Sequence, residues 1–170
     1  MAIGNKVFSY CAAPPRLVIH TRADDGGWAA TGTTTLTNVI TDVKDKFGTI
    51  VTMATANGSI YLASNLDDRV LVMSQDGDPL MVHGSEGRGP PGEFLRPYLC
   101  DVDSEGSILV ADRGNSRLQV FDSNKIEWSE VDLWPPVTSP GDAVLLNNNL
   151  YVVSGTDPEY MINLCQPPDD

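Results

Sequence analysis

The 170-residue sequence has few of the residues that bind metals, form disulfides or neutralise nucleic-acid phosphates. It contains three cysteines and two histidines, and its 11 lysines and arginines are outnumbered by 23 aspartates and glutamates. Because Cys11, Cys100 and Cys165 form no Cys-x-x-Cys pair, we expect buried, reduced thiols rather than a disulfide framework or a zinc site. The net charge of -12 disfavours nucleic-acid binding unless a local basic patch overrides it.

Long apolar runs are also absent. No segment reaches the roughly 18 apolar residues of a membrane span, and Met1 to Cys11 lacks a basic start followed by a sustained apolar run. These absences predict a soluble, cytoplasmic protein with no membrane contact. Since no Gly-x-Ser-x-Gly motif occurs, and His20 and His83 have no serine, cysteine or carboxylate motif beside them, we expect no enzyme, cofactor or metal site.

Turn-forming residues and an internal repeat are what the sequence does contain. Its 15 glycines and 12 prolines are spread along the whole chain, as expected for many short strands joined by turns. Residues 58–63 (GSIYLA) recur as residues 106–111 (GSILVA), and residues 69–72 recur as 117–120 at the same offset. A period of roughly 40 to 50 residues is typical of propellers and solenoids.

The unit around residue 110 predicts a four-stranded antiparallel blade. Its short apolar stretches, bounded by turn residues, lie at residues 98–103, 107–112, 117–121 and near 126–132. The middle two stretches are almost continuously apolar, which indicates a sheet covered on both faces by neighbouring sheets. Asn57-Gly58 and Gly106 supply the tight turns between the first and second strands of two blades.

One unit resembles a nearly full NHL repeat. The resemblance rests on residues 92–97 (GEFLRP), 103–106 (DSEG), 110–112 (VAD) and 115–122 (NSRLQVFD). Other units depart from the pattern: Asp67 and Asp68 replace the usual residues of one turn, and the last unit has no arginine there. The resemblance implies an all-β NHL-type propeller. Its relatives include TRIM-NHL ubiquitin ligases, which recognise proteins or RNA, and more distantly metal-dependent lyases.

The chain is expected to be a single propeller domain over residues 1–170. The predicted units are a partial blade at about 4–33, blades at about 48–83 and 97–133, and a partial blade at about 141–165. Propellers of the resembled family usually have more blades than these three to four. We therefore expect a fragment with an incomplete ring, or a chain that completes its ring by self-association.

Two motifs suggest ligands but are interpreted as structural. Residues 87–92 match Gly-x-Gly-x-x-Gly, but two prolines lack the N–H groups that would bind phosphate, so we predict an inter-blade loop. Asp101, Asp103, Glu105 and Asp112 have an EF-hand-like spacing, but they fall on predicted strands and a hairpin turn rather than between helices.

The candidate binding residues are cations in loops predicted to share one face of the propeller. The face would carry Lys44, Lys46, Arg69, Arg88, Arg96, Arg113 and Arg117, with Phe94 and Tyr98 nearby. From this set we predict partner contacts by Arg69, Arg88, Phe94, Arg96, Tyr98 and Arg113. Asp112, Asn115 and Arg117 are assigned instead to a structural hairpin.

The predicted function is a non-catalytic scaffold that binds a protein partner through this face, such as the substrate-recognition part of a TRIM-NHL-like ligase. Single-stranded RNA on the same face is the first alternative. A metal-dependent propeller lyase or hydrolase is the second. Interleaved acidic residues also leave open an ordinary solvated loop surface.

Overall fold

The computed structural model describes residues 2–12, 15–35, 50–146, 149–156 and 159–165, which form four antiparallel sheets in chain order. The first sheet contains β1 (Ala2–Ile3), β2 (Lys6–Ala12), β3 (Pro15–Arg22) and β4 (Trp28–Thr35). The second contains β5 (Ile50–Ala56), β6 (Ser59–Ser64), β7 (Arg69–Ser74) and β8 (Pro79–His83). The third contains β11 (Pro97–Val102), β12 (Ile108–Asp112), β13 (Arg117–Asp122) and β14 (Glu127–Val131). The last contains β15 (Pro140–Leu146), β16 (Asn149–Thr156) and β17 (Glu159–Cys165).

The second and third sheets are joined by a loop that carries a small parallel sheet of its own. Its strands are β9 (Ser85–Glu86) and β10 (Glu93–Phe94). A 3-10 turn, η2 (Arg113–Asn115), connects β12 to β13. Strands in sequential order with tight turns make each large sheet a propeller blade, so the predicted all-β class is confirmed. The first blade was expected to be partial, but it has four strands because the short β1 lies before the predicted start at about residue 4.

The turns between first and second strands have the backbone that their residues favour. Asn57 and Gly58 have φ values of 49° and 73°, and Gly106 has a φ of 91°. Positive φ is accessible to glycine, and to a lesser extent to asparagine, so these residues allow the tight reversals that the sequence predicted.

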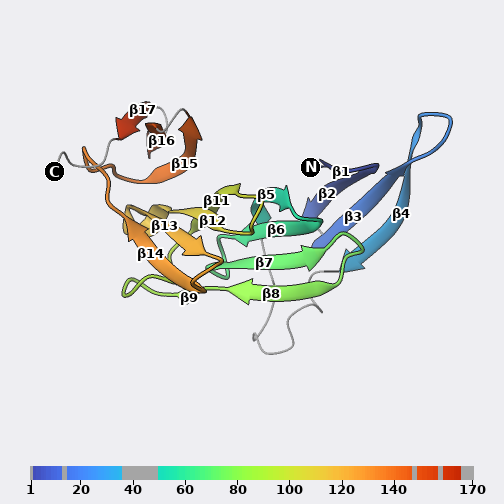
Figure 1. Ribbon diagram of the computed structural model, residues 1–170, viewed down its shortest axis with the longest axis horizontal. Coiled ribbons are helices and arrows are strands. Elements are labelled where there is room, and N and C mark those ends of the chain that lie inside the picture. The colour runs from blue at the N-terminus through green and yellow to red at the C-terminus, as the bar shows by residue number, and fades with distance from the viewer. Residues whose placement is uncertain (1, 13–14, 36–49, 147–148, 157–158, 166–170) are drawn as a thin grey trace.

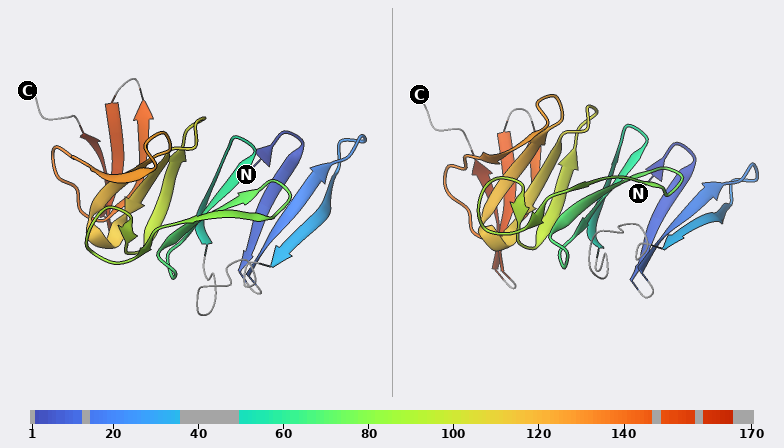
Figure 2. Two further views of the ribbon diagram at one scale, coloured as in Figure 1. Left: turned by 60° about the horizontal axis from the view of Figure 1, so that its bottom comes forward. Right: turned by 90° about the horizontal axis from the view of Figure 1, so that it is seen from below.

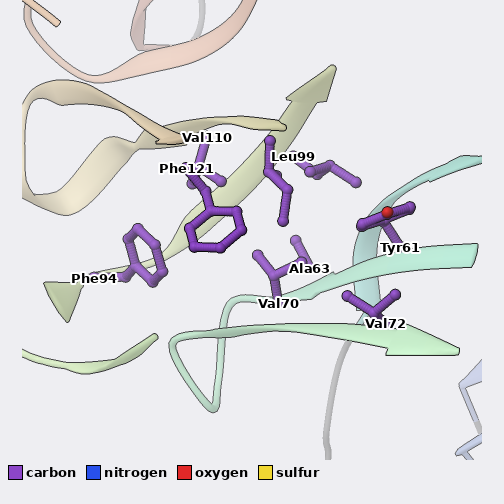
Figure 3. Packing of buried hydrophobic residues seen from close by; sticks show 9 residues of the cluster. Tyr61, Ala63, Val70, Val72, Phe94, Leu99, Val110 and Phe121 are labelled. Atoms are coloured by element: carbon purple, nitrogen blue, oxygen red, sulfur yellow. The ribbon is translucent and has the colours of Figure 1, made fainter. Parts of the chain in front are cut away.

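Three apolar clusters fill the spaces between successive blades. Strands β6 and β7 contribute to two of them, because alternate side chains point to opposite faces of the sheet. Leu62 and Leu71 face the first blade, whereas Ala63 and Val70 face the third (Figure 3). This double burial explains why the middle strands are almost continuously apolar in sequence.

The first strands of consecutive blades lie side by side. Thr55 Oγ1 of β5 donates to the carbonyl of Ala2 in β1 at 3.3 Å, and Leu99 N of β11 donates to Thr52 Oγ1 of β5 at 2.7 Å. With the first strands adjacent, the described turns between second and third strands, which belong to the second and third blades, emerge at one end of the blades. The described turns between first and second strands and between third and fourth strands emerge at the other end.

The four blades stand in a row whose first and last members lie at opposite ends, so the described blades do not close into a ring (Figures 1 and 2). The outward face of the last blade is apolar, and no other described blade covers it. Val144 is 52% exposed and Ile162 is 75% exposed.

The thiols are all free, but only Cys165 is fully buried, whereas Cys11 and Cys100 are partly exposed. Desolvation nevertheless raises the pKa of the Cys100 thiol to about 12. Among the described residues, no helix is long and apolar enough to cross a membrane.

Candidate binding face

Asp112 at the end of β12 is the centre of a buried hydrogen-bond network. Its carboxylate is fully buried and accepts from Leu95 N at 2.7 Å, Asn115 Nδ2 at 2.8 Å, Arg117 Nε at 2.9 Å and Gln119 Nε2 at 2.8 Å. A buried carboxylate is tolerated when it is paired and its lone pairs are satisfied, as they are here.

Arg117 and Gln119 extend this network to the loop between the second and third blades. Arg117 donates to the carbonyls of Gly89 and Glu93, each at 2.9 Å. Gln119 donates to the Glu93 carbonyl at 2.8 Å and accepts from Gly92 N at 2.8 Å. The residues that resemble the NHL pattern most closely therefore bind the chain's own loop.

Asn115 belongs to the same network through its side chain. The left-handed residue of the turn is Ser116, with φ 56°, whereas Asn115 lies within η2. Asn115 Nδ2 donates to Asp112 Oδ2 and to the Gly87 carbonyl, so the side chain does bond its own turn.

The assignment of Phe94 to partner binding is wrong. Its ring is completely buried and packs edge-on against Trp128, with ring centroids 5.0 Å apart. A Cβ on Gly84, where φ is +85°, would stand 2.2 Å from the Phe94 ring, so only glycine fits there. Phe94 is a core residue that fixes the loop between the two blades, as its position among the cluster residues shows (Figure 3).

Three of the other predicted contact residues come together in a polar pocket of about 650 Å³. The pocket is lined by Asn65, Arg96, Tyr98, Arg113, Gly114, Ser116 and Ser139. Apart from Tyr98, which lies at the start of β11, these residues come from the turns between second and third strands of the second and third blades, and from the segments that precede β11 and β15. We call it the arginine pocket.

The two arginines of the arginine pocket are held differently. Arg113 lies over the Tyr98 ring, 5.7 Å from its centroid, and donates through Nη2 to the Gly155 carbonyl at 3.4 Å. Arg96 is exposed and has a left-handed backbone, with φ 54°. Its backbone N donates to Asp68 Oδ1 at 2.6 Å, which anchors the main chain and leaves the guanidinium at the surface.

Among the described residues that line the arginine pocket there is no acidic side chain, although the whole chain carries a net charge of -12. The buried carboxyl of Asp68 lies behind Arg96, and desolvation raises its pKa above the usual value. Ser139 N donates to Ser116 Oγ at 3.3 Å, which ties the segment before the last blade to the turn of the third. The pocket can therefore offer two guanidinium groups and two hydroxyls to an anionic group.

The remaining predicted cations do not line the arginine pocket. Arg88 is exposed on the loop that Asn115 and Arg117 anchor. Arg69 stands at the repeat position of Arg117 and is partly buried, and its Nε has no hydrogen-bond partner in the part of the chain described. Lys44 and Lys46 fall outside the described residues.

Asn65, Ser116 and Ser139 were not predicted as site residues. The repeat indicates one of them, because Asn65 occupies in the second blade the position that the predicted contact residue Arg113 occupies in the third. Ser116 and Ser139 carried no such signal, since their proximity depends on how two blades pack.

The two ligand-like motifs form a loop and a hairpin turn. Residues 87–92 connect β9 to β10 and lead into a strand. Asp103 caps a turn through bonds from Glu105 N and Ser107 N, each 2.8 Å, far along the strand from buried Asp112. Across the described ranges, no three His, Cys, Asp or Glu residues come together in a way that could hold a metal.

The histidines have partners that the sequence did not indicate. His20 Nε2 lies 3.0 Å from Ser9 Oγ on the neighbouring strand. His83 is buried against Phe121 and Trp128, with centroid distances of 4.4 and 5.9 Å. Neither histidine lies in the arginine pocket.

Four-stranded blades, side-by-side first strands and a row that does not close define an incomplete β-propeller. Its signature residues indicate the type of repeat: residues 101–121 match the NHL repeat family.

Relatives with the same repeat align with part of the chain. NHL repeat-containing protein 3 of Homo sapiens is 43% identical over 74 residues, which cover 42% of this chain and 21% of that protein. E3 ubiquitin-protein ligase TRIM71 of Rattus norvegicus is 53% identical over 45 residues, covering 26% of this chain and 5% of the ligase. The aligned segments thus span about a fifth or less of the length of these relatives.

Solved propellers align with nearly the whole chain. A streptogramin B lyase structure superimposes with a TM-score of 0.58 at 14% identity, and the match covers 93% of this chain and 50% of the lyase. A protein from Lactobacillus plantarum gives a TM-score of 0.56 at 15% identity, covering 95% of this chain and 53% of that one. At this identity the likeness concerns the fold alone.

Proposed function

We propose that this chain is a non-catalytic interaction module, and that the arginine pocket binds an acidic group of a protein partner. The similarity to NHL-repeat and TRIM-NHL proteins supports a propeller interaction domain in general. The observation that carries the specific proposal is a pocket with Arg96 and Arg113 in which none of the described lining residues is acidic, on a chain that is otherwise strongly acidic.

The contact between Arg113 and the Tyr98 ring favours a protein group over an RNA base as the ligand of the arginine pocket. A base would need a free aromatic face for stacking, but Arg113 already covers the Tyr98 ring. Phe94, the other aromatic side chain considered for stacking, is buried. A carboxylate needs only the guanidinium edges, which can bind it in a bidentate manner.

The experiment compares peptides and RNA as ligands of the same variants. Acidic, neutral and basic peptides on an array, and single-stranded RNA homopolymers, are tested with the wild-type chain and with Arg96→Glu/Arg113→Glu. We expect acidic peptides to bind and the double variant to lose them, because a hydrogen bond to a charged group contributes about 1.5–3 kcal/mol.

Arg22→Glu/Lys125→Glu is the matched control, since it changes the net charge equally at two exposed cations outside the pocket. Its binding of acidic peptides should stay near that of the wild type. Equal losses in both double variants would contradict the proposal. Tight, salt-sensitive RNA binding without peptide binding would replace it with the RNA alternative.

We also propose that the outward face of the last blade associates with a second copy of the chain. Its exposed apolar side chains, including Val144 and Ile162, line a shallow pocket of about 260 Å³ together with Tyr151 and Val153. An uncovered apolar sheet face of this kind favours association.

A further inference from the structure

A second pocket lies between the second and third blades, at the end of the strands opposite the arginine pocket. It has a volume of about 470 Å³. Leu80 and Met81 of β8 form one side, Ile126 forms the other, and His83 and Phe121 are buried lining residues. We call it the lateral crevice.

The strand beside the lateral crevice has an unpaired edge. Among the described strands, β8 pairs with β7 alone. Three consecutive side chains of β8 are exposed: Leu80 at 59%, Met81 at 54% and Val82 at 37%. Residues 80–83 carry no charged side chain, and burial lowers the pKa of His83, which keeps it neutral near pH 7.

The corresponding strand of the third blade provides an internal comparison. Strand β14 also occupies the outer position of its sheet, but it exposes Glu127, Ser129 and Glu130. Charged side chains on an edge strand discourage pairing with other chains, and exposed apolar ones do not. The edge of β8 from Leu80 onward therefore lacks the protection that β14 has.

The charged residues around the lateral crevice are mostly acidic. Glu105 lines it, Asp78 precedes β8 and Glu127 follows Ile126, and all three are exposed. The Glu105 carboxylate accepts from neutral Asn124 Nδ2 at 2.9 Å, whereas the nearby cation Lys125 is already paired with Asp122 at 3.0 Å. An apolar crevice with this rim is complementary to an apolar segment flanked by basic residues.

We infer that the lateral crevice binds an extended peptide that adds a strand to β8, inserts an apolar side chain between Met81 and Ile126, and carries lysine or arginine at its ends. Main-chain hydrogen bonds to the free edge give such a complex its affinity, and the crevice selects the side chain. This site is independent of the arginine pocket, which has the opposite charge and lies at the other end of the blades.

The test uses a synthetic peptide of about ten residues, the length of a long strand, with alternating leucine and threonine and a lysine at each end. Fluorescence anisotropy measures its binding to the wild-type chain. Leu80→Lys and Met81→Lys should each weaken binding by about tenfold or more, because they place a cation in the crevice. Both residues are exposed, so the thermal midpoint should change little.

Two control variants and two control peptides make the result specific. Leu66→Lys, at an exposed leucine in the turn before β7, should bind the peptide as the wild type does. Arg96→Glu/Arg113→Glu should also bind it, which separates this site from the proposed function. A peptide with glutamate ends, and one with N-methylated alternate amides on its pairing edge, should both bind weakly.

The inference is overturned if the lysine-ended peptide does not bind the wild-type chain. It also fails if Leu80→Lys binds that peptide unchanged, or if the glutamate-ended peptide binds equally well.

Discussion

At the residue scale, His83 links stability to pH. It is buried against Phe121 and Trp128, and desolvation lowers its pKa from the ordinary value of 6.5. The unfolded chain therefore takes up a proton on this side chain at a higher pH than the folded chain does. Protonation stabilises the unfolded state, so the contribution of neutral His83 is fully present above 6.5 and is lost as pH falls toward the lowered pKa.

We expect the free energy of unfolding to fall more steeply between about pH 7.5 and about pH 5 in the wild type than in His83→Asn. Urea denaturation at a series of pH values measures the difference between the two proteins. Comparing the two curves removes the common contribution of the carboxylates. Parallel curves would show that His83 titrates alike in the folded and unfolded chains.

At the element scale, the loop between the second and third blades is held by side chains of the third. Asp112 accepts from Leu95 N, and Arg117 and Gln119 bind the carbonyl of Glu93. The NHL-like residues are thus the reason that β9, β10 and the loop around them keep a defined path beside the blade. They also position Arg96, and through it one side of the arginine pocket.

Asp112→Ala is expected to reduce the free energy of unfolding by about 3–5 kcal/mol, because it leaves the largely buried Arg117 without its carboxylate. Urea denaturation gives the magnitude. Asp101→Ala, at an exposed aspartate of β11, is the control and should cost far less. Trypsin should also cleave the chain after Arg88 faster in Asp112→Ala than in the wild type, because the loop loses its anchor. An unchanged cleavage rate together with a small loss of stability would contradict the anchoring role of Asp112.

At the scale of the whole molecule, the outward face of the last blade is not covered by another described blade. The faces between the first and second, second and third, and third and last blades are filled by apolar clusters. The outward face of the last blade carries the same kind of side chains without a covering blade, as its position at the end of the row shows (Figure 2). This difference is the basis for the proposed association of two copies.

Light scattering coupled to size exclusion should give a mass above that of one chain, falling toward one chain on dilution. Val144→Lys/Ile162→Lys should shift the mass to that of one chain at all concentrations, because buried lysines oppose association. Leu80→Lys/Leu66→Lys is the matched control and should keep the wild-type mass. A wild-type chain that stays single at high concentration would rule out this association.

The sequence alone determined the blades. Strand positions in the third blade were predicted to within about a residue or two, since apolar stretches, turn glycines and a repeat are local signals. The repeat also predicted that Arg96, Tyr98 and Arg113 share one end of the blades, because it fixes which turns lie together. It could not show that Phe94 turns inward, since that burial depends on Gly84 and Trp128 in neighbouring segments.

Only the tertiary structure decided which surface residues form sites. The arginine pocket needs Ser139, which packing brings to Ser116, and the lateral crevice needs Leu80 and Met81 of β8 to lie near Ile126 of the third blade. These arrangements depend on the angle between blades, which side chains from many segments set together. A pattern along one strand does not carry that information, because it records which face of a sheet is buried and not what stands opposite it.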